Sequence, residues 1–172
     1  MLRLRPYKNC DAEHIVKWIK DEISFRKWCA DRFETYPLSA EMLNESYMKE
    51  LDNDRFFEMT ALEENKVVGH FIMRFVDDER KVLRFGFVIV DDSIRGKGYG
   101  KKMLSLGLKY AFEILKVDKI TIGVFDNNPG AYHCYKSLGF SEVGENEYYT
   151  IMDEQWLCIE LEYKKSKWEN CV

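Results

Sequence analysis

The chain has 172 residues, 46% of them hydrophobic and 15% aromatic, which predicts one globular domain with a substantial core. Its net charge of −4 gives no electrostatic basis for nucleic-acid binding. No stretch approaches the roughly 18 apolar residues that a membrane span requires, and the charged N-terminus lacks the apolar core of a secretion signal.

The thiol and imidazole groups of the chain show no ligand pattern. The cysteines are odd in number and form no Cys-x-x-Cys pair, which favours reduced thiols in the cytoplasm over a disulfide framework or a zinc site. The histidines also lack metal-ligand spacing, so no metal is expected. The residues concerned are Cys10, Cys29, Cys134, Cys158, Cys171, His14, His70 and His133.

The N-terminal third has a helical pattern. Residues 2–5 predict a short strand, and Asp11 is a suitable N-cap for a first helix. Residues 23–33 predict either helix or loop, and their aromatic side chains follow no regular period. Pro37 ends this stretch, and a further helix is expected over 39–51.

The middle of the chain changes to strand periodicity. Apolar residues over 56–64 and 66–76 flank Glu64-Asn65, a pair that predicts a hairpin turn. Residues 81–90 form the next predicted strand, which is apolar on both faces in its second half and therefore expected near the centre of a sheet.

A helix–strand–helix unit follows. Residues 98–115 carry an apolar face at helical spacing, and 118–125 predict a strand. The next helix, 129–138, is opened by Pro129 and stopped by Gly139.

Two final runs, 147–152 and 155–163, predict an antiparallel pair around Asp153-Glu154. Residues 164–172 predict a loose polar tail. The sum is one mixed α/β domain over 1–172 with about seven strands and a single βαβ-like unit.

The sequence "SIRGKGYGKK", residues 93–102, places three glycines and four basic side chains between a predicted strand and a predicted helix. Glycines at a helix entrance leave backbone N–H groups uncovered, and with the helix dipole these donors favour an anion such as a pyrophosphate. The alternative is an ordinary solvated loop. The bend does not match the G-x-x-x-x-G-K-[ST] phosphate loop, and Lys101 stands where the dinucleotide motif G-x-G-x-x-G requires its third glycine.

The segment "RGKGYG" resembles the R/Q-x-x-G-x-G/A motif of the GNAT acetyltransferase superfamily, with Arg95, Gly98 and Gly100 at its defining positions. The later segment "NPGAYHCYKSLGF" is similar to a second element of that family, N-x-x-A-x-x-x-Y-x-x-x-G-F. Its matching residues are Asn128, Ala131, Tyr135, Gly139 and Phe140. The resemblance covers residues 56–163, and the N-terminal helices match only in layout.

This resemblance implies a GNAT-like fold, with a mixed, mostly antiparallel central sheet that is splayed between its fourth and fifth strands and flanked by helices. It implies acetyl-CoA as co-substrate, with its pyrophosphate on the bend and its pantetheine arm beside the main chain of the fourth strand. The residues expected to bind acetyl-CoA are Val88, Ile89, Val90, Arg95, Gly96, Lys97, Gly98, Tyr99, Gly100, Lys101, Asn128 and Tyr135.

Tyr135 is similar to the general acid of the family. A phenol with a pKa of about 10 is protonated at neutral pH and can donate a proton to a departing thiolate. The alternative for Tyr135 is aromatic packing on the sheet, and for Asn128 it is a turn role. A backbone amide at Val88 or a neighbour is expected to stabilise the oxyanion of the transition state.

The general base is where the sequence departs from some relatives. Members that acetylate protein N-termini often carry a Glu on the fifth strand, five residues before the motif Asn, and here that position is Gly123. Glu58 and Asp126 are the remaining candidates. The absence weakens the interpretation as a protein N-terminal, ribosomal-protein-type, acetyltransferase without excluding it.

The expected function is therefore acetyl transfer from acetyl-CoA to a primary amine, either a small molecule or a peptide N-terminus, with a homodimer as a further expectation. The alternatives are a non-catalytic acyl-CoA-sensing domain and a nucleotide-binding module, for which the phosphate-loop pattern is missing. The candidate residues for an acceptor-binding wall are Trp18, Phe25, Trp28, Tyr36, Tyr148 and Tyr149.

Overall fold

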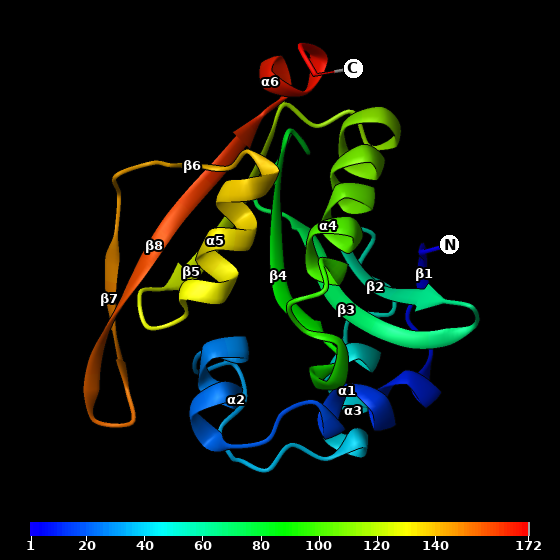
Figure 1. Cartoon of the computed structure of the whole chain (residues 1–172), viewed down its shortest axis with the longest axis vertical. Coiled ribbons are helices and arrows are strands. Elements are labelled where there is room, and N and C mark those ends of the chain that lie inside the picture. The colour runs from blue at the N-terminus through cyan, green and yellow to red at the C-terminus, as the bar shows by residue number, and fades with distance from the viewer. Residues whose placement is uncertain (172) are drawn as a thin grey trace.

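A computed structural model describes residues 1–171 as eight strands and six α-helices (Figure 1). The strands are β1 (Arg3–Pro6), β2 (Phe56–Glu63), β3 (Lys66–Phe75), β4 (Val82–Val90), β5 (Lys119–Phe125), β6 (Ser141–Glu142), β7 (Glu147–Ile151) and β8 (Glu154–Lys164). The helices are α1 (Ala12–Lys17), α2 (Glu22–Cys29), α3 (Ala40–Met48), α4 (Tyr99–Lys109), α5 (Pro129–Leu138) and α6 (Lys165–Glu169). Short 3-10 turns cover Asn9–Asp11 and Asp92–Ile94, and α4 continues into a π-helical turn, Tyr110–Ile114.

All strands belong to one sheet, in the order β1-β2-β3-β4-β5-β8-β6, with β7 also paired to β8. Every neighbouring pair is antiparallel except β4 and β5, which run parallel because α4 connects them. The predicted mixed, mostly antiparallel sheet is therefore confirmed. The eighth strand is the two-residue β6, which is too short to leave a periodic pattern in the sequence.

The two faces of the sheet carry separate clusters of apolar side chains. Met103, Leu104 and Leu108 of α4 pack with Phe71 and Phe85 of the sheet in the larger cluster. The other face is covered near one end of the sheet by α1, α2 and α3 (Figure 1), where Ile72 and Ile89 contact the helices. Strands β3 and β4 therefore contribute buried side chains to both clusters.

The parallel pair of β4 and β5 is short. Val82 to Phe85 pair with Lys119 to Ile122, and the pairing ends there. Beyond that point β4 continues beside β3 and β5 continues beside β8, so the facing edges of the two strands have no partner strand. The predicted splay between the fourth and fifth strands is confirmed.

Local signals located most of the turns. Glu64 and Asn65 have φ of 47° and 69°, the left-handed conformation of a two-residue hairpin turn. In the last hairpin the prediction was wrong by one residue, because Met152 and Asp153 are the residues with positive φ. These residues form the turn before Glu154 starts β8.

The C-terminal tail differs from the expected loose polar segment. Residues 165–169 form α6, and the Trp168 ring stacks on Phe112 with 5.7 Å between centroids and 24° between planes. Phe112 in turn packs on Tyr163 of β8. An aromatic contact over more than fifty residues of sequence therefore holds the segment against the domain.

Candidate active site

The bend between β4 and α4 presents a run of unpaired backbone donors. The amides of residues 95–101 form no hydrogen bond within the described part of the chain, and the first helical bond of α4 runs from Lys102 N to Gly98 O (3.0 Å). Gly96 and Gly98 have φ of 77° and 82°, a conformation that favours glycine. The bend thus exposes a row of N–H groups at the positive end of a helix dipole.

The start of α4 differs from those of the other helices of eight residues or more. Asp21 caps α2 by accepting a hydrogen bond from Ser24 N at 2.7 Å, and Ser39 caps α3 at Met42 N (3.1 Å). Gly98 at the N-cap of α4 has no side chain with which to do this. The N-terminal donors of α4 are left for a ligand, since orphan helix amides are otherwise satisfied by caps or water.

A cavity of about 720 Å³ extends from this bend into the splay between β4 and β5. All of the residues predicted to bind acetyl-CoA line it except Lys97, which is exposed to solvent. Val88, Ile89 and Val90 border it along β4, and Asn128 and Tyr135 border it from the α5 side. The two sequence motifs, which lie some thirty residues apart, therefore meet at one cavity.

Arg95, one of the residues expected to bind acetyl-CoA, also makes hydrogen bonds within the protein. Its Nε donates to the Val90 carbonyl at 3.1 Å and its Nη2 donates to the Trp18 carbonyl at 3.1 Å. The side chain thus ties the bend to β4 and to the segment after α1. One of the main-chain groups expected to face the pantetheine, the Val90 carbonyl, is occupied by this contact.

Asn128 is the N-cap of α5, where its Oδ1 accepts a hydrogen bond from Ala131 N (3.4 Å). The turn role is therefore present, and Asn128 borders the cavity as well.

Tyr135 is buried beside the cavity, and its hydroxyl has no hydrogen-bond partner among residues 1–171. Burial raises the pKa of its phenol above the ordinary value. The group therefore keeps its proton throughout the neutral range. Its ring also packs against Phe140, so the structural alternative, aromatic packing, holds together with a place at the cavity.

Gly123 on β5 lies under an ion pair. Arg84 of β4 and Glu160 of β8 form two hydrogen bonds of 2.8 Å, and this bond to Glu160 raises the pKa of Arg84. A Cβ atom on Gly123 would lie 2.7 Å from Arg84 Nη2 and 3.0 Å from both Glu160 Oε1 and Cys158 Sγ. The space that a fifth-strand Glu would need is filled from the neighbouring strands.

The two remaining candidates for a general base lie away from the cavity. Glu58 is on β2, two strands from the splay, and burial raises the pKa of its carboxyl. Asp126 is exposed beyond the end of β5. Neither side chain lines the cavity, and among the described residues that do line it there is no Asp or Glu.

Two of the six residues predicted to form an acceptor-binding wall line the cavity, and the other four do not. Trp18 and Trp28 line the cavity, and Trp28 Nε1 is a buried donor without a partner among the described residues. Phe25 is fully buried in the core, and Tyr36 packs against the same cluster. Tyr149 packs on Phe125 at the last hairpin, and Tyr148 is mostly exposed.

Several cavity residues gave no signal in the sequence. Gly86 and Phe87 of β4 line the cavity, and Phe87 has a φ of 49° at an irregularity in the pairing of β3 with β4. Lys27 of α2 and Cys134 of α5 also border it. Cys134 directly precedes Tyr135 in the second motif, which is the one local signal that could have placed it.

A splayed parallel pair with a cavity of free amides at a helix entrance is the arrangement expected of an enzyme that uses acetyl-CoA. A profile of the acetyltransferase (GNAT) family matches residues 20–140, and the chain belongs to this family. Membership confirms the predicted family, and with it the predicted class of enzyme, an acyltransferase that uses acetyl-CoA.

Individual relatives agree with this membership. The SPbeta prophage-derived uncharacterized N-acetyltransferase YokL of Bacillus subtilis (strain 168) is 29% identical over 111 residues, which are 64% of this chain and 62% of that protein, so less than two thirds of that relative is covered. The spermidine N(1)-acetyltransferase of Vibrio cholerae is 27% identical over 145 residues, or 83% of this chain and 80% of that enzyme. A crystal structure of spermidine N-acetyltransferase from Vibrio cholerae in complex with CoA and spermine superposes with a TM-score of 0.83 at 23% identity and covers 98% of both chains, which shows the shared fold.

No helix within residues 1–171 is long and apolar enough to cross a membrane. All five cysteines are free thiols in the described structure.

Proposed function

We propose that this protein transfers the acetyl group of acetyl-CoA to a primary amine of a small-molecule acceptor. The observation that carries the proposal is the row of unpaired amides at residues 95–101, at one end of a cavity that continues into the splay. Backbone donors at a helix N-terminus suit a diphosphate, and an unpaired strand edge suits the amide groups of an extended pantetheine arm.

The roles of the individual residues follow from their positions. Gly96, Gly98 and Gly100 keep side chains away from the amides that receive the diphosphate. The unpaired β4 edge at Val88 and Ile89 is assigned to the pantetheine arm and, at Val88, to the oxyanion. Tyr135 is assigned to protonate the departing thiolate, because burial keeps its phenol protonated at the cavity wall.

Deprotonation of the acceptor amine is assigned to water, because no carboxylate among the described residues lines the cavity. Glu160 stands over Gly123 next to the splay, but both of its oxygens accept hydrogen bonds from Arg84, so its charge is neutralised and it is not assigned as the base. An enzyme with a Glu on its fifth strand could use that carboxylate as the base, whereas this chain has Gly123 at the position.

The relatives supply the first acceptors to test. Several of them are named as spermidine or spermine N-acetyltransferases, and one related structure contains spermine. A peptide N-terminus is the second acceptor class. We place the enzyme in the cytoplasm, where its free thiols stay reduced, and we propose self-association, because one structural neighbour is described as dodecameric.

The test is an assay of free thiol release with purified protein, acetyl-CoA and a panel of spermidine, spermine, simple alkylamines and short peptides. Transfer to at least one amine, with the acetylated product identified by mass spectrometry, is the expected result. Binding of CoA without transfer to any of these amines would instead favour the sensor function.

A further inference from the structure

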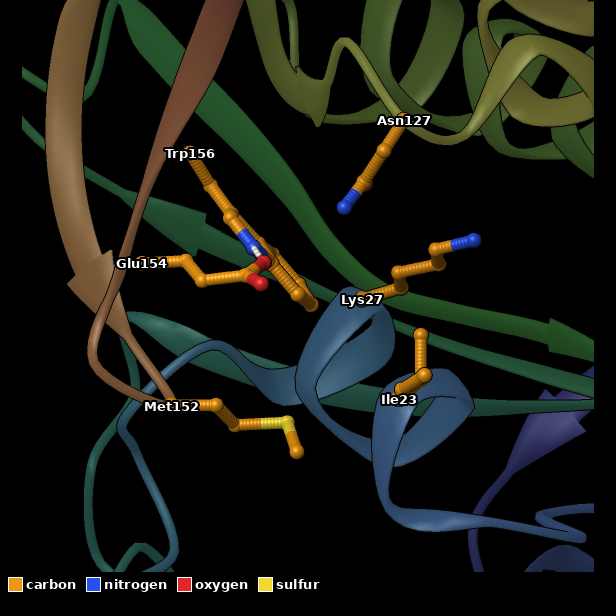
Figure 2. Close-up of a pocket in the computed structure, with 6 residues that line it drawn as sticks. All are labelled: Ile23, Lys27, Asn127, Met152, Glu154 and Trp156. Carbon is orange, nitrogen blue, oxygen red and sulfur yellow. Dashed lines mark hydrogen bonds between the residues drawn. The ribbon is translucent and has the colours of Figure 1, made fainter.

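A second, smaller pocket of about 200 Å³ adjoins the larger cavity. It lies between α2 and the hairpin of β7 and β8, and we call it the hairpin pocket (Figure 2). It is lined by Ile23, Lys27, Asn127, Met152, Glu154 and Trp156. Lys27 also lines the larger cavity, and Asn127 precedes Asn128, which does so too, so the two spaces are neighbours.

Two groups in the hairpin pocket favour a positively charged ligand. Glu154 brings a carboxylate whose Oε2 accepts a hydrogen bond from Trp156 Nε1 at 3.3 Å. The Trp156 indole projects into the pocket and offers an aromatic face (Figure 2). Asn127 turns the nitrogen of its amide toward the same space (Figure 2), whereas its Oδ1 is buried without a hydrogen-bond partner among residues 1–171, so Asn127 borders the pocket and is not assigned to the cation.

The rim of the pocket is apolar and open. Ile23 on α2 and Met152 at the hairpin turn are 51% and 46% exposed. Methylene groups of a ligand would cover this surface, which is favourable at about 25 cal/mol per Å². A ligand that combines an ammonium group with an alkyl chain satisfies both parts of the pocket.

Lys27 lines both the hairpin pocket and the larger cavity, so its positive charge acts on any ligand that extends from one to the other. Its ammonium has no salt-bridge partner within the described residues, and Figure 2 shows its side chain extending away from Glu154 and Trp156. A positive charge on the ligand next to Lys27 would be repelled, whereas an uncharged spacer would not.

We propose that the hairpin pocket binds the distal, non-reacting ammonium of a diamine acceptor whose primary amine is acetylated at the splay. Glu154 and Trp156 recognise this ammonium, and Lys27 selects for an uncharged spacer between the two amines. This inference rests on the proposed function, because it assumes that the reacting amine lies in the larger cavity. It names the acceptor class as an α,ω-diamine, in preference to a polyamine with an internal charge.

The test compares 1,4-diaminobutane with butylamine, two acceptors that differ only in the distal ammonium. For Glu154→Gln, kcat/KM for the diamine is expected to fall about fivefold, as is typical of one partly exposed charge pair, with kcat/KM for the monoamine unchanged. The matched control is Glu162→Gln, which neutralises a carboxylate of the same strand that pairs with Lys119 and Lys164 and lines neither space. It should leave both acceptors unaffected.

Lys27→Gln provides an independent readout. It should raise kcat/KM for spermidine, which carries an internal charge, about threefold more than for 1,4-diaminobutane. An equal effect of Glu154→Gln on diamine and monoamine would overturn the pocket assignment. Equal effects of Lys27→Gln on spermidine and diaminobutane would overturn the role of Lys27.

Failure of the proposed function would look different. If the native protein transferred acetyl groups to neither amine, the proposed reaction would be refuted. Calorimetric titration of 1,4-diaminobutane in the presence of CoA would still test whether the hairpin pocket binds an ammonium group. Binding that is weakened by Glu154→Gln and not by Glu162→Gln would support it. Equal affinity of the native and Glu154→Gln proteins, or no binding to the native protein, would overturn it.

Discussion

The buried carboxylate of Asp11 and the backbone amides at residues 95–101 differ in how their hydrogen-bonding capacity is used. Asp11 is 1% exposed, and both of its oxygens have partners: Arg5 donates to each, at 2.6 and 2.8 Å, and the Lys8 amide and the Thr60 hydroxyl add bonds of 2.9 and 2.8 Å. The amides of the bend have no such partner within the described residues. Polar groups that hold the fold together are satisfied internally, and those that meet a ligand are left open.

Because the two regions are built differently, mutations can separate stability from function. Substitutions around Asp11 should change the free energy of unfolding and leave ligand binding alone. Substitutions at the cavity should do the reverse.

The largest effect is expected from Asp11→Ala. The variant removes the hydrogen bonds from Arg5, Lys8 N and Thr60 and leaves a half-buried Arg5 without its partner, so the free energy of unfolding should fall by about 3 kcal/mol. Urea denaturation followed by circular dichroism measures this. The affinity of the folded protein for CoA should stay within about twofold of the native value. A comparable loss of CoA affinity would break the separation of the two regions.

Tyr135→Phe tests the cavity, where a substitution should lower activity and leave stability unchanged. Loss of the general acid should lower kcat about 100-fold. Because the hydroxyl has no partner among residues 1–171, the free energy of unfolding should change by less than about 0.5 kcal/mol. Steady-state kinetics with a saturating amine and parallel urea denaturation provide both numbers. An unchanged kcat would remove Tyr135 from the mechanism.

Gly98→Val tests the bend itself. A β-branched residue at a φ of 82° is strained, and its side chain would stand beside the free amides, so CoA should bind about 30-fold more weakly, or by about 2 kcal/mol. Lys97→Ala is the control, since Lys97 does not line the cavity, and it should weaken binding less than about threefold. Isothermal titration calorimetry compares the two. Equal losses would show that charge, rather than the backbone, holds the diphosphate.

Local signals in the sequence were sufficient where a few neighbouring residues determine the conformation. The turn at Glu64-Asn65 and the helix from Pro129 to Gly139 follow from turn chemistry, the fixed φ of proline and the left-handed φ of 110° at Gly139. The glycine spacing of the bend likewise located the free amides. The two motifs carried the family and the parts of the cavity that the bend and α5 form.

What the sequence could not predict depends on contacts over long distances. Arg95 bonds to the Trp18 carbonyl, 77 residues away, and no local pattern distinguishes this from a ligand-binding arginine. The Arg84–Glu160 pair over Gly123 joins strands that are 76 residues apart in sequence. Phe87 takes a positive φ only because β4 is irregular against β3, so its place at the cavity is a property of the sheet.

The smallest expected effect is on the pH dependence of the free energy of unfolding, through Asp11. Burial by itself would raise the pKa of Asp11, but hydrogen bonds from Arg5, Lys8 N and Thr60 outweigh it and lower the pKa below its ordinary value. A group whose pKa is lowered in the folded state contributes stability above its unfolded pKa of about 4, and that contribution is lost as the pH falls further. Acid should therefore destabilise the native protein through this site.

Asp11→Asn isolates this contribution, because the amide keeps the shape of the side chain and does not ionise. Between about pH 4 and pH 2 its free energy of unfolding should fall less steeply than that of the native protein, by about 1 kcal/mol over the interval. Gly98→Val, which changes no ionisable group, should follow the native slope. Urea midpoints measured across this range compare the three proteins, and parallel slopes for Asp11→Asn and the native chain would show that Asp11 is not the group that couples folding to acid.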